Sequence, residues 1–265
     1  MTAEPATPGS PCPAGAGVTP YLIMETAAGR IEIRLDPQAA PAAIERFLSV
    51  VRGPVFNETL FGNNEVGYYD GLTFAYTRPQ IEIRTAERQP SGLIQIPVQI
   101  DAESLGLHED KIADINQATD VMQFELLKDF SNSKESGKRT PQLDNLVAHW
   151  FNKFDAKNLI GVSRKEINEA LGYLYTPGLP SRPVKRGAVA LKPLSPKLAG
   201  MELTIALSDL DERTGRWMVI GEVVTGLNLA DSISTQPLRE PPHVRSRTYI
   251  PYEPVVIESA RVTCR

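Results

Sequence analysis

The sequence predicts a β domain that is interrupted by a block of helices. Segments with alternating apolar and polar residues, typical of half-buried strands, lie in the first third of the chain and again after Gly187. Between them, apolar residues recur at helical spacing. We therefore expect a β domain at 21–86 and 187–265, a largely helical insertion at 87–186, and a flexible tail rich in Pro and Gly at 1–20.

The composition limits the classes of function. Of the 265 residues, 42% are hydrophobic, which is enough for a sizeable core. The net charge of −4 leaves no basic excess of the kind that nucleic-acid binding needs. No apolar run approaches the ~20 residues of a membrane span. We therefore expect a soluble protein with no nucleic-acid partner and no membrane span.

The first part of the β domain begins with a hairpin. Ile31, Ile33 and Leu35 alternate with charged residues, as in a strand with one buried face, and Gly29 supplies the turn before it. Pro41 suits the first turn of a helix. In order, we expect strands at Tyr21–Glu25 and Arg30–Leu35, a helix from Pro41 to Gly53-Pro54, a loop at 54–67, and strands at Tyr68–Tyr76 and Gln80–Thr85.

Three helices are expected in the insertion. Thr140 can cap the strongest of them, and Ser163 with Glu166 forms a capping-box pattern at the start of the last. The strongest helix has an apolar stripe that forms either the insertion's own core or a groove for a partner, and the core is the simpler interpretation. The stripe consists of Leu143, Leu146, Val147, Trp150, Phe151 and Phe154. The helices are expected at Lys111–Phe130, Gln142–Phe154 and Arg164–Leu174, with a polar break at 131–139.

After Gly187 the strand pattern returns. We expect strands at Ala188–Leu191, Leu203–Leu207, Trp217–Val223 and Pro254–Val262, and a short helix at Leu227–Ile233.

Four groups of residues then follow one another in a familiar order. They are Thr26, Gly29, Ile31, Ile33 and Leu35 with Ala40-Pro41 and Phe47; Tyr69-Asp70-Gly71-Leu72-Thr73-Phe74; Gly187-Ala188-Val189-Ala190; and Gly221-Glu222-Val223-Val224-Thr225-Gly226 with Leu229, Asp231 and Ile233. Together they resemble the cyclophilin family of peptidyl-prolyl isomerases over about 21–85 and 187–263. The resemblance implies a closed antiparallel β-barrel capped by two helices.

The resemblance also implies a chemistry. Cyclophilins rotate the peptide bond before proline, whose barrier of ~18–20 kcal/mol comes from amide resonance. In the family an arginine hydrogen-bonds the prolyl nitrogen, an apolar pocket holds the ring, and a glutamine orients the backbone. We therefore expect a protein that binds an extended, proline-containing polypeptide and uses no cofactor or metal.

The residues at the family's site positions are different here. Tyr76 stands at the arginine position, Ile81 at the pocket phenylalanine and Arg84 at the glutamine. The family's serine-glutamine-phenylalanine-phenylalanine stretch corresponds to Met201-Glu202-Leu203-Thr204, and its tryptophan and histidine fall near Glu212 and Trp217. We expect weak or lost isomerase activity, since one missing donor costs ~10²–10³ in rate elsewhere. The expected ligand-contacting residues are Phe74, Ile81, Glu202, Leu203 and Trp217.

Two arginines could replace the missing one. Arg78 shares strand parity with Tyr76 but lies about 7 Å further along, and Arg84 could reach the pocket from a neighbouring strand. The candidate catalytic residues are therefore Tyr76, Arg78 and Arg84. The simpler alternative is that both arginines are solvated surface residues.

Two functions from different classes fit these observations. One is a slow or non-standard isomerase, and the other is a non-catalytic subunit of a larger assembly that binds its partner through the helical insertion. His108, His149 and His243 are too dispersed to predict a metal site.

Cys12 and Cys264 are the only cysteines. They are either two free thiols or one disulfide, and a disulfide would imply an oxidising compartment. In the cyclophilin family the first and last strands are antiparallel neighbours, which would bring Cys264 close to the start of the first strand. The composition of the tail fits export weakly, as in a chain whose signal has been removed. We expect a periplasmic or otherwise exported protein, with the cytoplasm as the alternative.

Overall fold

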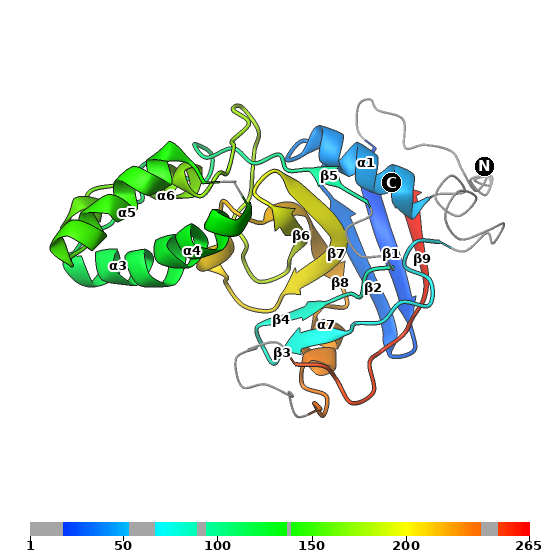
Figure 1. Cartoon of the computed structure of the whole chain (residues 1–265). Coiled ribbons are helices and arrows are strands. Elements are labelled where there is room, and N and C mark those ends of the chain that lie inside the picture. Colours follow the sequence, from blue (N-terminus) through cyan, green and yellow to red (C-terminus); the bar gives the residue numbers. More distant parts are fainter. Residues whose placement is uncertain (1–17, 53–66, 89–93, 137–138, 240–248) are drawn as a thin grey trace.

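The computed structural model describes residues 18–52, 67–88, 94–136, 139–239 and 249–265. Within them, nine strands form one antiparallel sheet that curls into a barrel (Figure 1). The order of the strands is β3-β4-β7-β6-β8-β2-β1-β9, and β5 pairs with β7. The strands are β1 (Pro20–Thr26), β2 (Gly29–Leu35), β3 (Tyr76–Arg78), β4 (Glu82–Arg84), β5 (Ile96–Pro97), β6 (Ala188–Ser195), β7 (Leu198–Ala206), β8 (Met218–Thr225) and β9 (Ile257–Cys264).

The two edges of this sheet meet, because the chain just before β3 pairs with the chain just before β9. Thr73 and Val256 form an antiparallel bridge. Beside it, the backbone N–H of Phe74 donates to the Val255 carbonyl at 2.9 Å. These bonds satisfy edge groups that would otherwise be left unpaired. The mainly antiparallel, barrel-like fold expected from the sequence is confirmed.

The first and last strands are neighbours, as expected. β1 pairs antiparallel with β9, from Pro20 opposite Cys264 to Glu25 opposite Ser259. Cys264 is disulfide-bonded. Cys12, the other cysteine of the chain, lies outside the described residues, so the pairing of Cys12 with Cys264 stays a prediction.

The core fills the inside of the barrel. Ile31 and Ile33 of β2 are fully buried, which is the face that their alternation predicts. Helix α1 (Pro41–Val51) covers one end of the barrel and buries Phe47, and α7 (Leu227–Ser234) covers the other and buries Ile233 (Figure 1). Tyr69 is also fully buried, and its hydroxyl donates to the Met201 carbonyl at 2.7 Å.

The glycine between β8 (Met218–Thr225) and α7 cannot be replaced by a larger residue without a collision. Gly226 follows β8 and starts α7 with a φ of +88°. A Cβ atom at this position would collide with the backbone carbonyl of Arg30 in β2. Only glycine combines this φ with so close an approach of two backbones.

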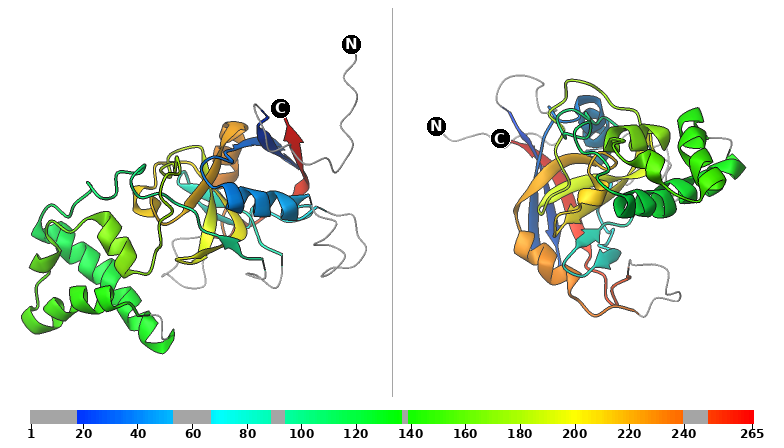
Figure 2. Two further views of the ribbon diagram at one scale, coloured as in Figure 1. Left: turned by 90° about the horizontal axis from the view of Figure 1, so that it is seen from above. Right: turned by 90° about the vertical axis from the view of Figure 1, so that its left-hand side faces the viewer.

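The insertion forms a helical lobe beside the barrel, on the side away from β1 and β9 (Figure 2). It contains α3 (Ile115–Asp120), a π-helix (Val121–Leu126), α4 (Leu127–Ser136), α5 (Pro141–Lys153), a 3₁₀ turn (Lys157–Leu159) and α6 (Arg164–Ala170). The lobe has its own apolar core, which includes Leu143 and Val147. Phe154, at the far end of the predicted stripe, is exposed.

The expected insertion boundary at residue 87 is too early. Ile96 and Pro97 pair with β7, and Ile94, Ile96 and Ile100 belong to the core of the barrel. The helical lobe therefore begins only after the chain has contributed a further short strand.

Two other predictions differ locally from the structure. Residues before Thr73 form a turn instead of a strand, because the Asp70 carboxylate accepts hydrogen bonds from the N–H groups of Gly67 and Ala260. The first part of the predicted polar break at 131–139 is helical, since α4 continues to Ser136. The predicted tail and the loop at 54–67 fall almost entirely outside the described residues.

A buried carboxylate joins the entrance and the exit of the insertion. Asp101 accepts hydrogen bonds from the backbone N–H of Ser104 at 2.9 Å and from that of Gly178. Its own N–H donates to the Ser181 hydroxyl at 2.8 Å. Burial raises the pKa of Asp101, but the backbone hydrogen bonds from Ser104, Gly178 and Glu103 outweigh burial and hold it below its usual value.

Candidate functional site

A cluster of charged side chains covers the outer face of strands β3, β4, β7 and β6. We call it the charged face, and it consists of Arg78, Glu82, Arg84, Lys192, Glu202 and Arg213. The strand pairing explains why several of them meet. Tyr76 lies opposite Arg84 and Arg78 opposite Glu82, while Arg84 lies opposite Thr204 of β7. The intervening residues, such as Ile83, point into the barrel core.

Glu82 is at the centre of one half of this face. Its side chain is only 1% exposed and forms a bidentate ion pair with Arg213, with Nη2 of Arg213 at 2.9 Å from Oε1. Arg78 and Arg84 each approach the same oxygen to 3.9 Å. A buried carboxylate needs such partners, because an unpaired charge at this depth would be costly.

Glu202 organises the other half. Its carboxylate accepts a hydrogen bond from Arg84 Nη1 at 2.7 Å and another from Lys192 Nζ at 2.7 Å. Glu202 is 4% exposed and Arg84 12% exposed. Arg78, which approaches Glu82, and Arg84 are therefore both partly buried in ion pairs. This contradicts the alternative that the two arginines are solvated surface residues.

A small apolar cluster borders the charged face on the same side of the sheet. Ile81 and Trp217 pack at its margin against the buried residues Val184, Ala188, Ala190, Ala206, Leu210 and Val219. The guanidinium of Arg213 lies 4.2 Å from the centre of the Trp217 ring, and that of Arg84 lies 5.2 Å from the centre of the Tyr76 ring. Apolar and cationic groups are therefore interleaved here.

A loop that borders this face also contacts the helical lobe. This segment, residues 208–217 between β7 and β8, is called the 208–217 loop. Arg213 of this loop binds Glu82, whereas Arg216 donates to Asn168 Oδ1 at 2.6 Å and pairs with Glu125 of the π-helix. The charged face and the insertion thus share one short segment of chain.

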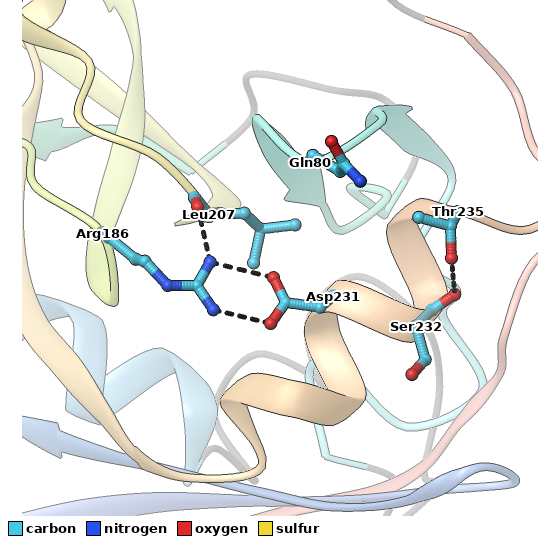
Figure 3. Close-up of a pocket in the computed structure, with 6 residues that line it drawn as sticks. All are labelled: Gln80, Arg186, Leu207, Asp231, Ser232 and Thr235. Carbon is cyan, nitrogen blue, oxygen red and sulfur yellow. Dashed lines mark hydrogen bonds and ion pairs between the residues drawn. The ribbon is translucent and has the colours of Figure 1, made fainter.

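A separate pocket of about 360 Å³ lies at the α7 end of the barrel (Figure 3). It is lined by Gln80, Arg186, Leu207, Asp231, Ser232 and Thr235. Arg186 and Asp231 form a bidentate ion pair at 2.9 and 2.6 Å, and hydrogen bonding to Arg186 holds the pKa of Asp231 below its usual value. The charged groups of this pocket therefore already have partners, which makes it a weaker candidate than the charged face.

Metal ligation finds no support among the described residues, which contain no group of three or more His, Cys, Asp or Glu side chains able to hold an ion. His149 pairs with Asp155 alone, and His243 lies outside the described residues. In the same part of the chain, none of the helices is both long enough and apolar enough to span a bilayer.

The family model of the cyclophilin type peptidyl-prolyl cis-trans isomerases matches residues 21–262 of the chain. The chain belongs to this family. Among solved structures, it is similar to a cyclophilin type peptidyl-prolyl cis-trans isomerase of Cryptosporidium parvum, with 11% sequence identity and a TM-score of 0.47 over 92% of this chain and 98% of the other. A second structure of that enzyme, in the presence of the dipeptide Ala-Pro, gives a TM-score of 0.46 at the same identity and coverage.

Of the cyclophilin site positions predicted from the sequence, some lie together on the outer face. Tyr76, Arg84 and Glu202 share it with Arg78, and Ile81 and Trp217 border it. Two predicted ligand contacts are wrong. Phe74 and Leu203 are 1% exposed and belong to the barrel core, because their side chains point inward. They support the cyclophilin barrel without reaching its outer surface.

Three members of the charged face were not predicted from the sequence: Glu82, Lys192 and Arg213. Glu82 could have been found, because it shares strand parity with Arg84 two residues later. Arg213 carried no such signal, since it is separated from Glu82 by 131 residues.

Proposed function

We propose that this cyclophilin-family protein binds an extended, proline-containing polypeptide on the charged face, with isomerase activity that is weak or lost. The observation that supports this proposal is the commitment of Arg84 to Glu202 at 2.7 Å. Arg84 is the cation nearest to Tyr76 in register. A guanidinium held by a carboxylate is poorly placed to donate to the prolyl nitrogen of a substrate.

Tyr76 supports the same proposal. Its neutral hydroxyl stands where the family has a positively charged donor. Losing one preorganised donor to a developing charge costs ~10²–10³ in rate in other enzymes. We therefore expect turnover of a proline peptide at least ~100-fold slower than in a cyclophilin with the full set of site residues.

A protease-coupled isomerisation assay on a proline tetrapeptide tests this proposal, with an intact cyclophilin as reference. A rate within a few-fold of the reference would overturn it. In that case Arg84→Ala should remove the activity if Arg84 has taken over the catalytic role, and Arg78→Ala should remove it if Arg78 has. Binding is measured separately by fluorescence anisotropy with a labelled proline peptide.

The second candidate function is a non-catalytic subunit of a larger assembly. The observation that favours it is the 208–217 loop, which joins the helical lobe to the charged face through Arg216 and Arg213. If proline peptides neither bind nor isomerise while the purified protein is folded, this second function becomes the better one.

A further inference from the structure

Arg78 differs from the other cations of the charged face in its contacts. Arg84, Lys192 and Arg213 each donate at least one hydrogen bond to Glu82 or Glu202. Within the described residues Arg78 donates none, and its nearest carboxylate oxygen is Glu82 Oε1 at 3.9 Å. That oxygen already accepts from Arg213 at 2.9 Å. The five N–H donors of the Arg78 side chain therefore have no hydrogen-bond acceptor among the described residues.

The charge count of the face agrees. Four cations, Arg78, Arg84, Lys192 and Arg213, are connected by ion pairs to Glu82, Glu202 and the exposed Glu212. Among the described residues these four cations thus pair with three carboxylates, and Arg78 has the most distant partner of the four.

A neighbouring polar group is short of a partner as well. Thr204 lies opposite Arg84 on the same face and is fully buried. Its hydroxyl has no hydrogen-bond partner in the described part of the chain. Buried polar groups are nearly always paired, so this face is short of partners at two places.

We propose that Arg78 binds the carboxylate of an acidic side chain in the polypeptide, so that the ligand is an acidic, proline-containing segment. This inference rests on the proposed function. The side chain of Arg78 is 20% exposed, which keeps the guanidinium accessible and shields it partly from water. A charge-assisted hydrogen bond to a carboxylate is stronger in such a place than on an open surface.

The spacing on β3 indicates where the acidic residue lies. Arg78 is two residues from Tyr76, which stands at the family's arginine position, so the two side chains are separated by about 7 Å along the strand. An extended ligand covers that distance in about two residues. The acidic side chain therefore lies about two positions before or after the proline.

Three labelled peptides of one length test this inference by fluorescence anisotropy. The first, Ala-Gln-Ala-Pro-Ala-Gln-Ala, is neutral in its side chains, and the other two carry glutamate in place of either the first or the second glutamine. We expect one glutamate peptide to bind about fivefold or more tightly at low salt, as one charge-assisted hydrogen bond allows. The preference should shrink as the ionic strength rises.

Two variants of equal charge change assign the effect. Arg78→Gln should abolish the preference for glutamate, so that the three peptides bind equally to this variant. Arg30→Gln, at an exposed position on β2, should keep the preference.

The possible outcomes separate the two proposals. Equal binding of all three peptides overturns the acidic ligand and leaves the proposed function standing. A glutamate preference that survives Arg78→Gln overturns the role of Arg78. If no peptide binds, both proposals fail.

Discussion

The Nη1 atom of Arg84 lies 2.7 Å from the Oε1 atom of Glu202, and the Glu202 side chain is 4% exposed. Lys192 shares the same carboxylate. Glu202→Gln would leave two cations without their closest anion in a partly buried place. We expect the free energy of unfolding to fall by about 2–3 kcal/mol, a little less than for a fully buried pair. Urea denaturation at pH 7 measures this loss.

Glu222→Gln is the matched control. Glu222 also pairs with two arginines, Arg34 and Arg182, but its side chain is 39% exposed. Ion pairs at that exposure contribute about 0–1 kcal/mol. Equal losses for the two variants would show that burial does not set the strength of the Glu202 pair.

Asp101 predicts a pH dependence for the junction between barrel and insertion. Its pKa is lowered from 3.8 in the folded protein, so its stabilising effect is complete above that value and is lost as the pH falls through the folded pKa. Asp101→Asn should lower stability by about 2 kcal/mol at pH 7, since hydrogen bonds to a charged acceptor are lost. The melting temperatures of the two proteins should draw together as the pH falls below about 3.8 and should meet only once the pH is below the folded pKa of Asp101. A melting-temperature gap that stays constant down to pH 3 would contradict the role of the ionised carboxylate.

Gly226 and Gly71 form a second matched pair. Both have positive φ, +88° and +77°. An added Cβ at Gly226 meets the Arg30 carbonyl, whereas at Gly71 it meets nothing within 4 Å. Gly71→Ala should cost about 1 kcal/mol from backbone strain alone, and Gly226→Ala about 2 kcal/mol more from the collision. If urea denaturation shows similar losses of unfolding free energy for the two variants, the collision with the Arg30 carbonyl does not explain why position 226 needs glycine.

Thiol counting on unreduced, denatured protein tests the pairing of Cys12 with Cys264. We expect no free thiol, which would support the proposal that the protein works in an oxidising compartment. Because a disulfide between these two residues would close a loop of almost the whole chain, the loop-entropy model predicts a stabilisation of about 4–5 kcal/mol at most. Two free thiols would end the idea and weaken the case for export.

The barrel could be predicted from the sequence because its signals are local. The alternation in β2 and the order of the glycine-containing segments depend on residues a few positions apart. The helical lobe was predictable for the same reason, with caps at Thr140 and Ser163 that the structure also uses. Its boundary was not, since β5 has two residues and pairs with a strand about one hundred positions later.

The charged face could be predicted only in part. Correspondence with the family placed Arg84 and Glu202 at site positions, but did not reveal that they pair across 118 residues. Leu203 was misplaced because adjacent residues of a strand face opposite sides of the sheet. Glu82 and Arg213 come into contact only in the folded chain, because 131 residues separate them, so no local sequence pattern predicts their ion pair.

The neighbouring positions of β1 and β9 have a consequence for engineering. Thr19 and Arg265 exchange two backbone hydrogen bonds, at 2.7 and 3.0 Å, so a short linker could join them once residues 1–18, which include Cys12, are removed. A circular permutant reopened beside the exposed Phe154 would then begin and end in the helical lobe. In such a molecule the barrel would be one uninterrupted stretch of chain, and the lobe would be assembled from its two ends.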